Sequence, residues 1–304
     1  MKTKSFEKVV CNLCGSDNYD IIYESTRYKR EAFNLYEFRS SGDEILMDQL
    51  VKCNNCSLSY VSPRIDSDIM LKGYRESIDK TFVSQTKGRE ITSEKSMKRI
   101  QSIWNKKPGK LLDVGTANGS FLKIAKEIGW EVYGCEPNKW MCKWCKENYD
   151  IDLDEGTLIE GKYSTNSFNV ISLWDVIEHT PDPKRVLEEC YRIMHHDGLL
   201  VANFPDFGSW IAKLMRGKWV FLLTVHYYYF TKKTLSKLML NSGFKVLLIK
   251  PHFQTLELDY ILYRSIKYIG IFAKIFRKVV SLIGLNKLNV PYWVGQSLII
   301  AKKS

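Results

Sequence analysis

Two patterns of hydrophobic and polar positions alternate along the chain from residue 110 onward. Short apolar runs predict strands, at 110–114, 131–136, 168–175, 198–204, 245–251 and 296–303. Apolar residues at every third or fourth position between these runs predict helices, at 120–128, 138–148, 184–194 and 231–243. Such alternation is typical of a parallel sheet with helices on both faces, which binds ligands at the carboxyl ends of its strands. We therefore expect an α/β fold: a doubly wound, Rossmann-like, mostly parallel sheet with a final antiparallel strand.

The residues before this sheet divide into two parts. Residues 1–63 hold two pairs of cysteines and are predicted to form a small zinc-binding module. Residues 64–107 are charged and helix-prone, which predicts a helical connector or lid. Residues 108–304 would then form the Rossmann-like domain.

Composition narrows the class of protein and its surroundings. The 304 residues are 45% apolar and 13% aromatic, as in a globular protein. No stretch reaches the roughly 18 apolar residues of a membrane-spanning helix, and the N-terminus lacks the apolar core and cleavage site of a signal peptide. We expect a cytoplasmic protein. Its net charge of +11, from 45 basic and 34 acidic residues, suits nucleic acid or an anionic membrane without choosing between them.

Four of the eight cysteines form two C-x-x-C pairs, Cys11 with Cys14 and Cys53 with Cys56. In a cytosolic chain, cysteines indicate metal or redox chemistry before disulfides. Each C-x-x-C turn directs two thiolates at one tetrahedral ion, so two turns complete the coordination shell of zinc. We predict a structural Zn(II) in a zinc-ribbon-like module, with no open position for chemistry.

The other cysteines have weaker signals. Cys142 and Cys145 lie three residues apart in a predicted helix, so a redox or metal role is conceivable. We favour the interpretation that they pack this helix against the sheet as small apolar residues. Cys190 has no partner in the sequence and is predicted to lie in the core.

The stretch "LLDVGTANGSFL", residues 111–122, has the form of a nucleotide-binding turn between a strand and a helix. A dinucleotide fingerprint would need glycines at 115, 117 and 120, but only Gly115 is present, with Ala117 and Ser120 at the other positions. The methyl group of Ala117 obstructs the close approach that a pyrophosphate needs. Asp113 adds a negative charge beside the turn, which suits an ammonium or sulfonium group. The turn therefore indicates a cationic nucleoside.

A second acidic residue, Glu136, ends the next predicted strand. In a doubly wound sheet an acid at this position faces the ribose of the nucleotide and accepts hydrogen bonds from its hydroxyl groups.

Several segments together resemble class I S-adenosylmethionine-dependent methyltransferases, in particular the branch that modifies small molecules, sugars and quinone-type lipids. They are "LLDVGTANGSFL", "VYGCEPN", "VISLWDVIEHTPDP", "GLLVANFP" and "HYYYFTKKTL". The paired cysteines resemble the N-terminus of some sugar and natural-product methyltransferases. The departure is Thr116-Ala117-Asn118, where a second glycine is frequent; the amino-acid end of the cofactor should tolerate Ala117.

The resemblance implies roles for residues of the turn and of the strand ends. The backbone around Gly115, Thr116, Ala117 and Gly119 would pass beneath the methionine portion of the cofactor, and Asp113 would lie near its ammonium group. Glu136 would hold the ribose, and Pro137 or Asn138 would border the adenine. Trp174 and Asp175 would flank the cofactor.

The sequence "DVIEH" contains candidate catalytic residues. Asp175, Glu178 and His179 have the spacing i, i+3, i+4 and would share one helical face on the substrate side. His179 can serve as a general base for a hydroxyl nucleophile. Quinone-type relatives are thought to hold a divalent cation with a similar acid/acid/histidine group, so Mg(II) is an alternative role, and capping of the next turn is another. His226, which opens a run of tyrosines, is a candidate for the substrate wall.

These features predict a methyltransferase whose acceptor is a small or lipid-linked hydroxyl compound, such as a sugar or a phenol/quinone. The zinc module would cover the cleft and help to select the acceptor. One rival is a nucleic-acid methyltransferase, which usually carries Asn/Asp-Pro-Pro-aromatic where this chain has "LWDV", or a Pro-Cys nucleophile, whose proline Cys190 lacks. The other rival is a non-catalytic cofactor-binding module.

Residues 257–290 lie where related folds have a short connection, so they form an insertion. Tyr260–Leu285 is predicted to be one basic amphipathic helix, with Arg264, Lys267, Lys274, Arg277 and Lys278 on one face and Ile266, Ile269, Phe272, Ile275, Phe276 and Val279 on the other. No acid follows Asp259. Such a helix can lie at an anionic membrane, which would make the protein membrane-associated, or its apolar face can pack on the domain or on a second subunit.

Overall fold

The structure is a computed structural model that describes residues 6–26, 38–42, 44–161 and 163–304. Its largest element is a seven-stranded sheet with the order β12-β15-β10-β9-β6-β7-β8. The strands are β6 (Lys110–Val114), β7 (Glu131–Glu136), β8 (Asp154–Glu155), β9 (Phe168–Trp174), β10 (Met194–Pro205), β12 (Phe244–Pro251) and β15 (Gln296–Lys303). The pairs from β10 to β8 are parallel, and β15 is antiparallel to both β10 and β12. The predicted mixed, mostly parallel sheet is confirmed.

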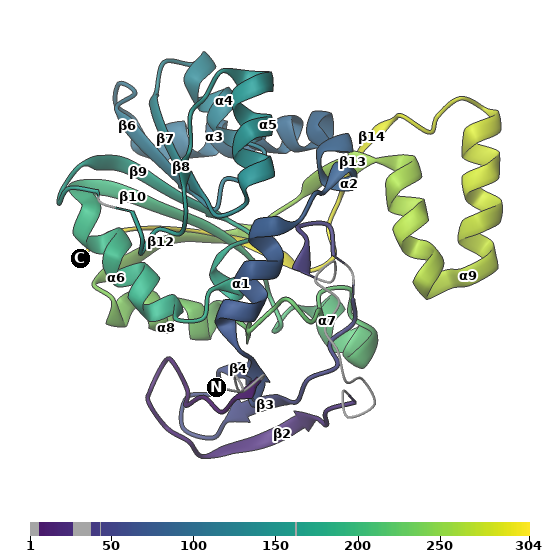
Figure 1. Cartoon of the computed structure of the whole chain (residues 1–304), viewed down its shortest axis with the longest axis horizontal. Coiled ribbons are helices and arrows are strands. Elements are labelled where there is room, and N and C mark those ends of the chain that lie inside the picture. Colours follow the sequence, from purple (N-terminus) through teal and green to yellow (C-terminus); the bar gives the residue numbers. More distant parts are fainter. Residues whose placement is uncertain (1–5, 27–37, 43, 162) are drawn as a thin grey trace.

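Helices cover both faces of this sheet (Figure 1). On one side lie α3 (Thr86–Trp104), α4 (Ser120–Glu127) and α5 (Lys139–Tyr149), and on the other lie α6 (Pro183–Ile193) and α8 (Lys232–Asn241). Successive strand residues face opposite layers: Leu111 packs in the cluster with α3 and α4, and Leu112 packs in the cluster with α6 and α8. The predicted helices of this domain are confirmed to within a few residues.

Capping residues fix where α8 begins and ends. Thr231 caps the N-terminus of α8, and Thr234 completes a capping box. Gly243, two residues beyond the helix, has the left-handed φ of 88° that glycine adopts most readily after a helix.

The first part of the chain builds a second, four-stranded antiparallel sheet with the order β11-β4-β3-β2. Its strands are β2 (Tyr19–Tyr23), β3 (Leu50–Cys53), β4 (Ser59–Val61) and β11 (Tyr228–Tyr229), and a separate pair joins β1 (Phe6–Glu7) to β5 (Arg64–Ile65). Because β11 belongs to the later part of the chain, the paired-cysteine module is completed by a segment of the large domain. The two parts also share one hydrophobic cluster.

Between the module and α3, the predicted helical connector contains α1 (Ser67–Glu76) and α2 (Lys80–Ser84). A short helix α7 (Trp210–Met215) and two 3-10 turns, η3 (Ile177–His179) and η4 (Arg216–Lys218), complete the elements near the strand ends. In Figure 1, α1 lies between the module and the main sheet.

The insertion is carried on a ribbon of two antiparallel strands, β13 (Gln254–Glu257) and β14 (Asn289–Tyr292). It contains α9 (Leu258–Leu282), whose helical backbone is interrupted at Gly270 by φ 53° and ψ −122°. The prediction of one continuous helix is therefore wrong: α9 is a hairpin of two helical arms that extends from the body of the protein (Figure 1). No helix within the described part of the chain is long and apolar enough to cross a membrane.

Candidate active site

The glycine turn joins β6 to α4 at the carboxyl end of the sheet. Gly115 and Gly119 have left-handed φ angles of 63° and 76°. A Cβ atom on Gly115 would lie 2.8 Å from Val176 Cγ2, and one on Gly119 would collide with Cys145 Sγ. Both positions therefore require glycine for conformation and for space. Ala117, between them, has a φ of 49°, so this turn keeps a left-handed residue where a second glycine is common.

Asp113 faces the interior of the protein. Its carboxylate oxygens accept hydrogen bonds from Thr116 Oγ1 and Ser172 Oγ, each at 2.6 Å. Burial raises the pKa of Asp113 to about 7, although these two hydrogen bonds act in the opposite direction. In this arrangement Asp113 holds the turn to the neighbouring strand. Its predicted contact with an ammonium group stays a prediction.

Glu136 connects the ends of β6 and β7. Its Oε2 accepts from the backbone N–H of Ala117 at 2.8 Å, and its Oε1 accepts from that of Asn138 at 2.7 Å. Burial raises the pKa of this carboxyl to about 7. Tyr74 also has a side-chain hydrogen bond with this carboxyl. A carboxylate has about four acceptor positions, so one remains for a further donor such as a ribose hydroxyl.

Asn138, which follows Pro137, links the end of β7 to α1. Its Oδ1 caps α5 through the N–H of Met141, and its Nδ2 donates to the carbonyls of Tyr74 and Ser77. These bonds place the end of α1 directly above the carboxyl end of β7. The connector thus covers the predicted nucleoside site.

Two other rings pack against Trp174 at the end of β9. Trp174 stacks on His252 with a centroid distance of 5.7 Å and packs against Phe121 at 4.8 Å. Its Nε1 is buried without a hydrogen-bond partner among the described residues. The predicted position of Trp174 beside the cofactor stays a prediction.

Arg89 belongs to the same region and was not predicted from the sequence. The first turn of α3 touches the glycine turn, because Asn118 Nδ2 donates to Thr86 Oγ1 at 3.0 Å. One turn later, the guanidinium of Arg89 lies 3.6 Å from the centroid of the Phe82 ring. Its Nε is buried and has no hydrogen-bond partner in the described ranges. In the sequence, Arg89 is one of many charges in the connector, so no local signal distinguishes it.

Asp175 does not lie on one helical face with Glu178 and His179, although its spacing predicted this. Its φ of 52° turns the chain sharply after β9. Its Oδ1 accepts from Asn203 Nδ2 at 2.6 Å, and its Oδ2 accepts from Gln254 Nε2 at 2.9 Å. The expected helical face shared by Asp175, Glu178 and His179 is therefore wrong.

Glu178 and His179 lie in η3 and meet His226 instead. One carboxylate oxygen of Glu178 and one ring nitrogen from each histidine all lie within 4.8 Å of one another. His179 Nδ1 bonds the carbonyl of Val225 at 2.9 Å, and His226 Nδ1 bonds that of Phe221 at 2.9 Å. Since a carbonyl only accepts, both Nδ1 atoms carry the proton, and both Nε2 atoms present lone pairs. We call Glu178, His179 and His226 the EHH group.

Burial controls the charge of the EHH group. It raises the pKa of Glu178 well above its ordinary value, and it lowers the pKa of His179 to about 4 and that of His226 well below its usual range. Neither carboxylate oxygen of Glu178 has a hydrogen-bond partner among the described residues. An unpartnered buried carboxyl beside two neutral imidazoles fits a divalent transition metal, whereas Mg(II) prefers oxygen ligands.

The paired-cysteine module positions His226. The residue after it, Tyr227, donates its N–H to Glu178 O at 2.9 Å and accepts from the N–H of Val61 in the module at 2.9 Å. In the first cysteine turn, Asn12 binds both Asp182 Oδ1 and the N–H of Lys184, just beyond η3. The module therefore contacts the residue after His226 and the segment that follows η3.

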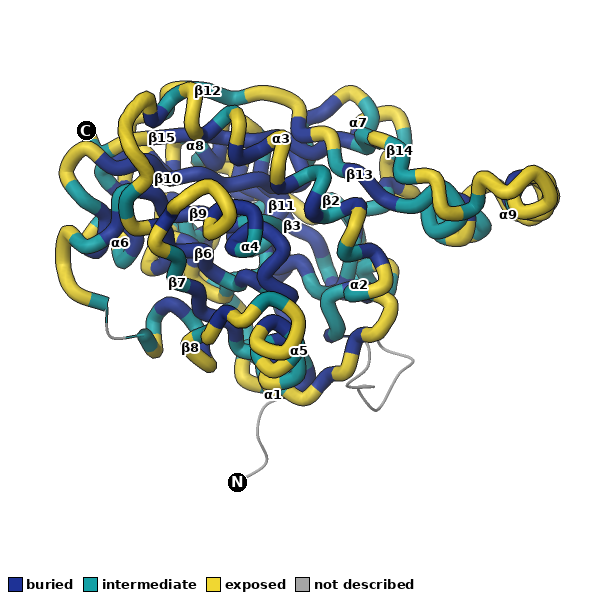
Figure 2. Tube along the Cα trace, turned by 90° about the horizontal axis from the view of Figure 1, so that it is seen from above, coloured by how far each residue is buried: buried dark blue, intermediate teal, exposed yellow. Residues whose placement is uncertain are grey.

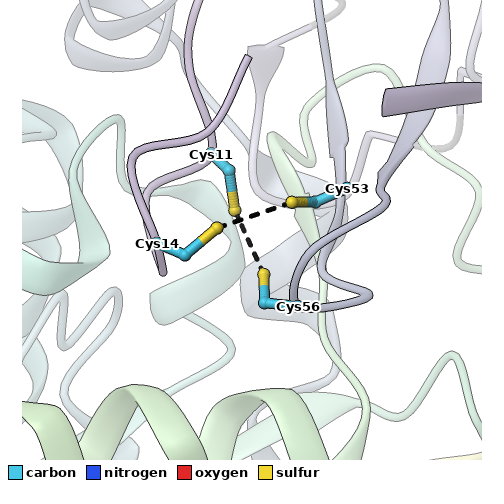
Figure 3. A group of neighbouring side chains, drawn as sticks. All are labelled: Cys11, Cys14, Cys53 and Cys56. Carbon is cyan, nitrogen blue, oxygen red and sulfur yellow. Dashed lines mark hydrogen bonds between the residues drawn. The ribbon is translucent and has the colours of Figure 1, made fainter. Parts of the chain in front are cut away.

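The four predicted zinc ligands come together (Figure 3). The Sγ atoms of Cys11 and Cys56 are 3.3 Å apart, those of Cys14 and Cys53 are 3.5 Å apart, and all four lie within 4.8 Å of one another. Four thiolates around zinc, with Zn–S bonds of about 2.3 Å, are separated by about 3.8 Å. The cluster therefore fits one tetrahedral ion with small adjustments.

Of the three other cysteines considered from the sequence, Cys145 and Cys190 pack in the core as predicted, whereas Cys142 is only partly buried. Cys145 and Cys190 are buried in hydrophobic clusters, and Cys142 Sγ donates to the carbonyl of Glu136 at 3.3 Å. None of the three belongs to a group of metal-ligating side chains in the described part of the chain.

Comparisons with known proteins identify the large domain. The sequence profile of a family described as "Methyltransferase domain" matches residues 89–249, more than half of the chain. A search of curated proteins found no match. A SAM-dependent methyltransferase from Archaeoglobus fulgidus is 20% identical, with a TM-score of 0.51 over 74% of this chain and 100% of that chain. A chain from the complex of the Haloferax volcanii Trm112 methyltransferase activator with a methyltransferase is 14% identical, with a TM-score of 0.52 over 74% and 95%. At these identities the two structures show a common fold.

Proposed function

The chain belongs to the methyltransferase-domain family, and we propose that it transfers the methyl group of S-adenosylmethionine to a hydroxyl group of a small or lipid-linked acceptor, of the sugar or phenol/quinone type. The observation that carries the hydroxyl assignment is the EHH group at the end of β9. An amine attacks with its own lone pair, whereas a hydroxyl needs its proton removed or its oxygen polarised. The EHH group offers ligands and hydrogen-bond acceptors that can polarise or deprotonate a hydroxyl acceptor.

The donor would bind across the carboxyl ends of β6 and β7. The turn from Gly115 to Gly119 would let the backbone approach the methionine portion, and the remaining acceptor position of Glu136 would bond the ribose. Arg89, one helical turn from the contact of α3 with the glycine turn, is a partly buried cation whose buried Nε has no partner in the described ranges. It would bind the methionine carboxylate.

Glu136→Ala is expected to weaken binding of S-adenosylhomocysteine by about 1 to 3 kcal/mol, because ribose hydroxyls lose their acceptor in a buried site. Titration calorimetry measures this loss. Glu155→Ala removes an exposed acid from the end of the next strand and should leave the affinity unchanged. Unchanged affinity in Glu136→Ala, with the fold intact by circular dichroism, would remove Glu136 from the site.

Arg89→Met is expected to weaken the binding of S-adenosylhomocysteine by about 1.5 to 3 kcal/mol, the range for a hydrogen bond to a charged group. The same substitution should leave the affinity for 5′-methylthioadenosine unchanged, because that compound has no carboxylate. Calorimetry with both ligands separates the carboxylate contact from general damage. Lys87→Met, on the exposed side of the same helix turn, is the matched control. Equal losses for both ligands would contradict this role.

The EHH group would prepare the acceptor. With pKa values held low by burial, His179 and His226 are weak general bases at neutral pH, so their neutral Nε2 atoms act better as ligands or hydrogen-bond acceptors. A divalent transition-metal ion, when bound by Glu178, His179 and His226, would lower the pKa of an acceptor hydroxyl. Mg(II), the alternative that the resemblance left open, suits this donor set less well.

The chain supplies orientation as well. Methyl transfer is an in-line displacement, so its main requirement is a nucleophile held against the methyl group with water excluded. The carbonyls of Val225 and Phe221 fix the two imidazole rings. The four-cysteine cluster, which we propose holds a structural Zn(II), would stabilise the sheet whose strand β11 begins two residues after His226.

Incubation with methyl-labelled S-adenosylmethionine and a fractionated cell extract tests the acceptor class. We expect label in lipid or in water-soluble small molecules. Label found in RNA would favour a nucleic-acid methyltransferase, and no transfer to any fraction, despite cofactor binding, would favour a non-catalytic binding module. Either outcome would contradict the proposed function.

A further inference from the structure

The α9 hairpin exposes an unusual amount of apolar surface. It extends from the body of the protein, and its trace is mostly exposed (Figure 2). Its exposed large apolar residues are Tyr263, Tyr268, Ile269, Ile271, Phe272, Ile275, Phe276, Val279 and Leu282, and Ile283, Leu285 and Leu288 follow in the connection to β14. Contiguous apolar surface of this kind on a soluble chain marks a contact with another body.

Most of this surface is one face of the second arm. Residues 271, 272, 275, 276, 279 and 282 recur at the spacing of one helical face, and Phe272 and Leu282 are 74% and 86% exposed. Ala273 and Val280 of the same arm, and Leu262 of the first arm, are instead buried. The exposed face is therefore separate from the buried positions of the hairpin.

The exposed charges beside the apolar face of the hairpin are positive. Arg277 of the second arm pairs with Asp259 of the first through two bonds of 2.6 and 2.8 Å, so this cation closes the hairpin. Arg264 donates to Ser41 O. These contacts correct the prediction of five cations on one solvent face. Lys274 and Lys278 stay exposed beside the apolar face, and no acid follows Asp259 in the sequence.

We propose that the α9 hairpin docks into the interfacial region of an anionic membrane, with its apolar face among the acyl chains and its lysines at the lipid head groups. The positive charge of the exposed lysines favours a membrane over a second copy of the chain as the binding partner. In a two-fold dimer the same face meets itself, which would bring lysines of both copies together without an acid to pair them. An anionic lipid surface complements both the lysines and the apolar face.

The hairpin is connected to the active-site region by a short path. Its base is the β13–β14 ribbon, in which Tyr292 donates to Gln254 Oε1 at 2.6 Å. Gln254 in turn donates to Asp175 Oδ2 at 2.9 Å. Docking would thus hold the domain that carries the end of β9 at the membrane. This part of the inference rests on the proposed function, and it selects a lipid-linked acceptor over a free one.

Vesicle flotation of the full chain tests the docking without methyl donor or acceptor. We expect binding to vesicles of equal parts phosphatidylcholine and phosphatidylglycerol, little binding to phosphatidylcholine alone, and release at high salt. Lys274→Gln with Lys278→Gln should lower partitioning about 30-fold, from about fivefold per surface cation. Phe272→Ser with Phe276→Ser should lower it by about tenfold or more.

The matched control is a triple change on α8, Lys233→Gln, Lys237→Gln and Leu240→Ser, which removes exposed residues of the same kinds elsewhere. It should bind vesicles as the wild type does. Absence of binding to anionic vesicles, or equal binding by all variants, would overturn the proposal. A wild-type dimer that Phe272→Ser with Phe276→Ser converts to a monomer, without vesicle binding, would assign the face to a second copy. S-adenosylhomocysteine affinity, measured on the same samples, reports separately on the proposed function.

Discussion

Glu178→Gln is expected to lower methyl transfer by about 10²- to 10⁴-fold, the range for removal of a group that moves or polarises the reacting proton. The amide keeps the volume of the side chain but removes the only carboxylate of the EHH group. Total label transferred from S-adenosylmethionine to the accepting extract fraction measures the effect. Binding of S-adenosylhomocysteine should not change, because Glu178 is separate from the proposed donor contacts.

His226→Gln should lower methyl transfer to a similar extent, because it removes another member of the EHH group. Glu188→Gln changes an exposed acid on α6 and should transfer methyl groups at the wild-type rate. Metal analysis after reconstitution supplies a second readout. Wild-type protein should retain one more divalent ion than Glu178→Gln. Full transfer by Glu178→Gln would show that the EHH group is structural.

Cys53→Ser is expected to release zinc and to lower the Tm by more than about 10 °C. Structural zinc contributes on the order of 10 kcal/mol to folding in small zinc-binding peptides, and each kcal/mol shifts Tm by about 2 °C in a large domain. The four-cysteine cluster lies at the end of the sheet that includes β11, which carries Tyr228 next to the His226 segment. Methyl transfer should therefore fall together with zinc content.

Cys142→Ala is the control, because this thiol lies outside the cluster and donates to the carbonyl of Glu136. It should keep zinc and most of the stability. Wild-type protein without zinc would refute the zinc site, and loss of zinc from Cys53→Ser without a change in Tm would refute its structural role.

Local patterns were sufficient for the main sheet and for the positions of the ligand turns. Alternation of short apolar runs with helical periods predicted each strand of the seven-stranded sheet except the two-residue β8. It did not predict the short strands β11, β13 and β14, which lie outside that sheet. Gly115 and Gly119 identified the turn, since both need left-handed backbone. The C-x-x-C spacing predicted which thiols meet, because each pair is local and only its partner pair is distant.

The EHH group could not be assembled from spacing. Glu178 and His179 are neighbours, but His226 reaches them only because β11 joins the sheet of the paired-cysteine module. Spacing also misplaced Asp175: the helical period assumed a helix, whereas a left-handed residue followed by a single 3-10 turn directs its carboxylate toward Asn203 and Gln254. Tertiary hydrogen bonds, invisible in the local pattern, decided both outcomes.

The insertion shows how a regular period can hide a break. Apolar and basic residues continue at helical spacing through Gly270, so the pattern predicted one helix. Glycine is a poor helix former and takes left-handed φ easily. The turn there lets Arg277 reach Asp259 and buries Ala273 and Val280 in the hairpin. These contacts between the arms exist only after the chain reverses.

The central claim is that the methyl group moves from S-adenosylmethionine to a hydroxyl oxygen. The most direct test is to run the reaction in unfractionated extract with cofactor that carries a carbon-13 methyl group, and to record the carbon–proton correlation spectrum of the products. The account predicts a new resonance in the O-methyl region that is absent with Glu178→Gln. A resonance in the N-methyl or C-methyl region instead would contradict it.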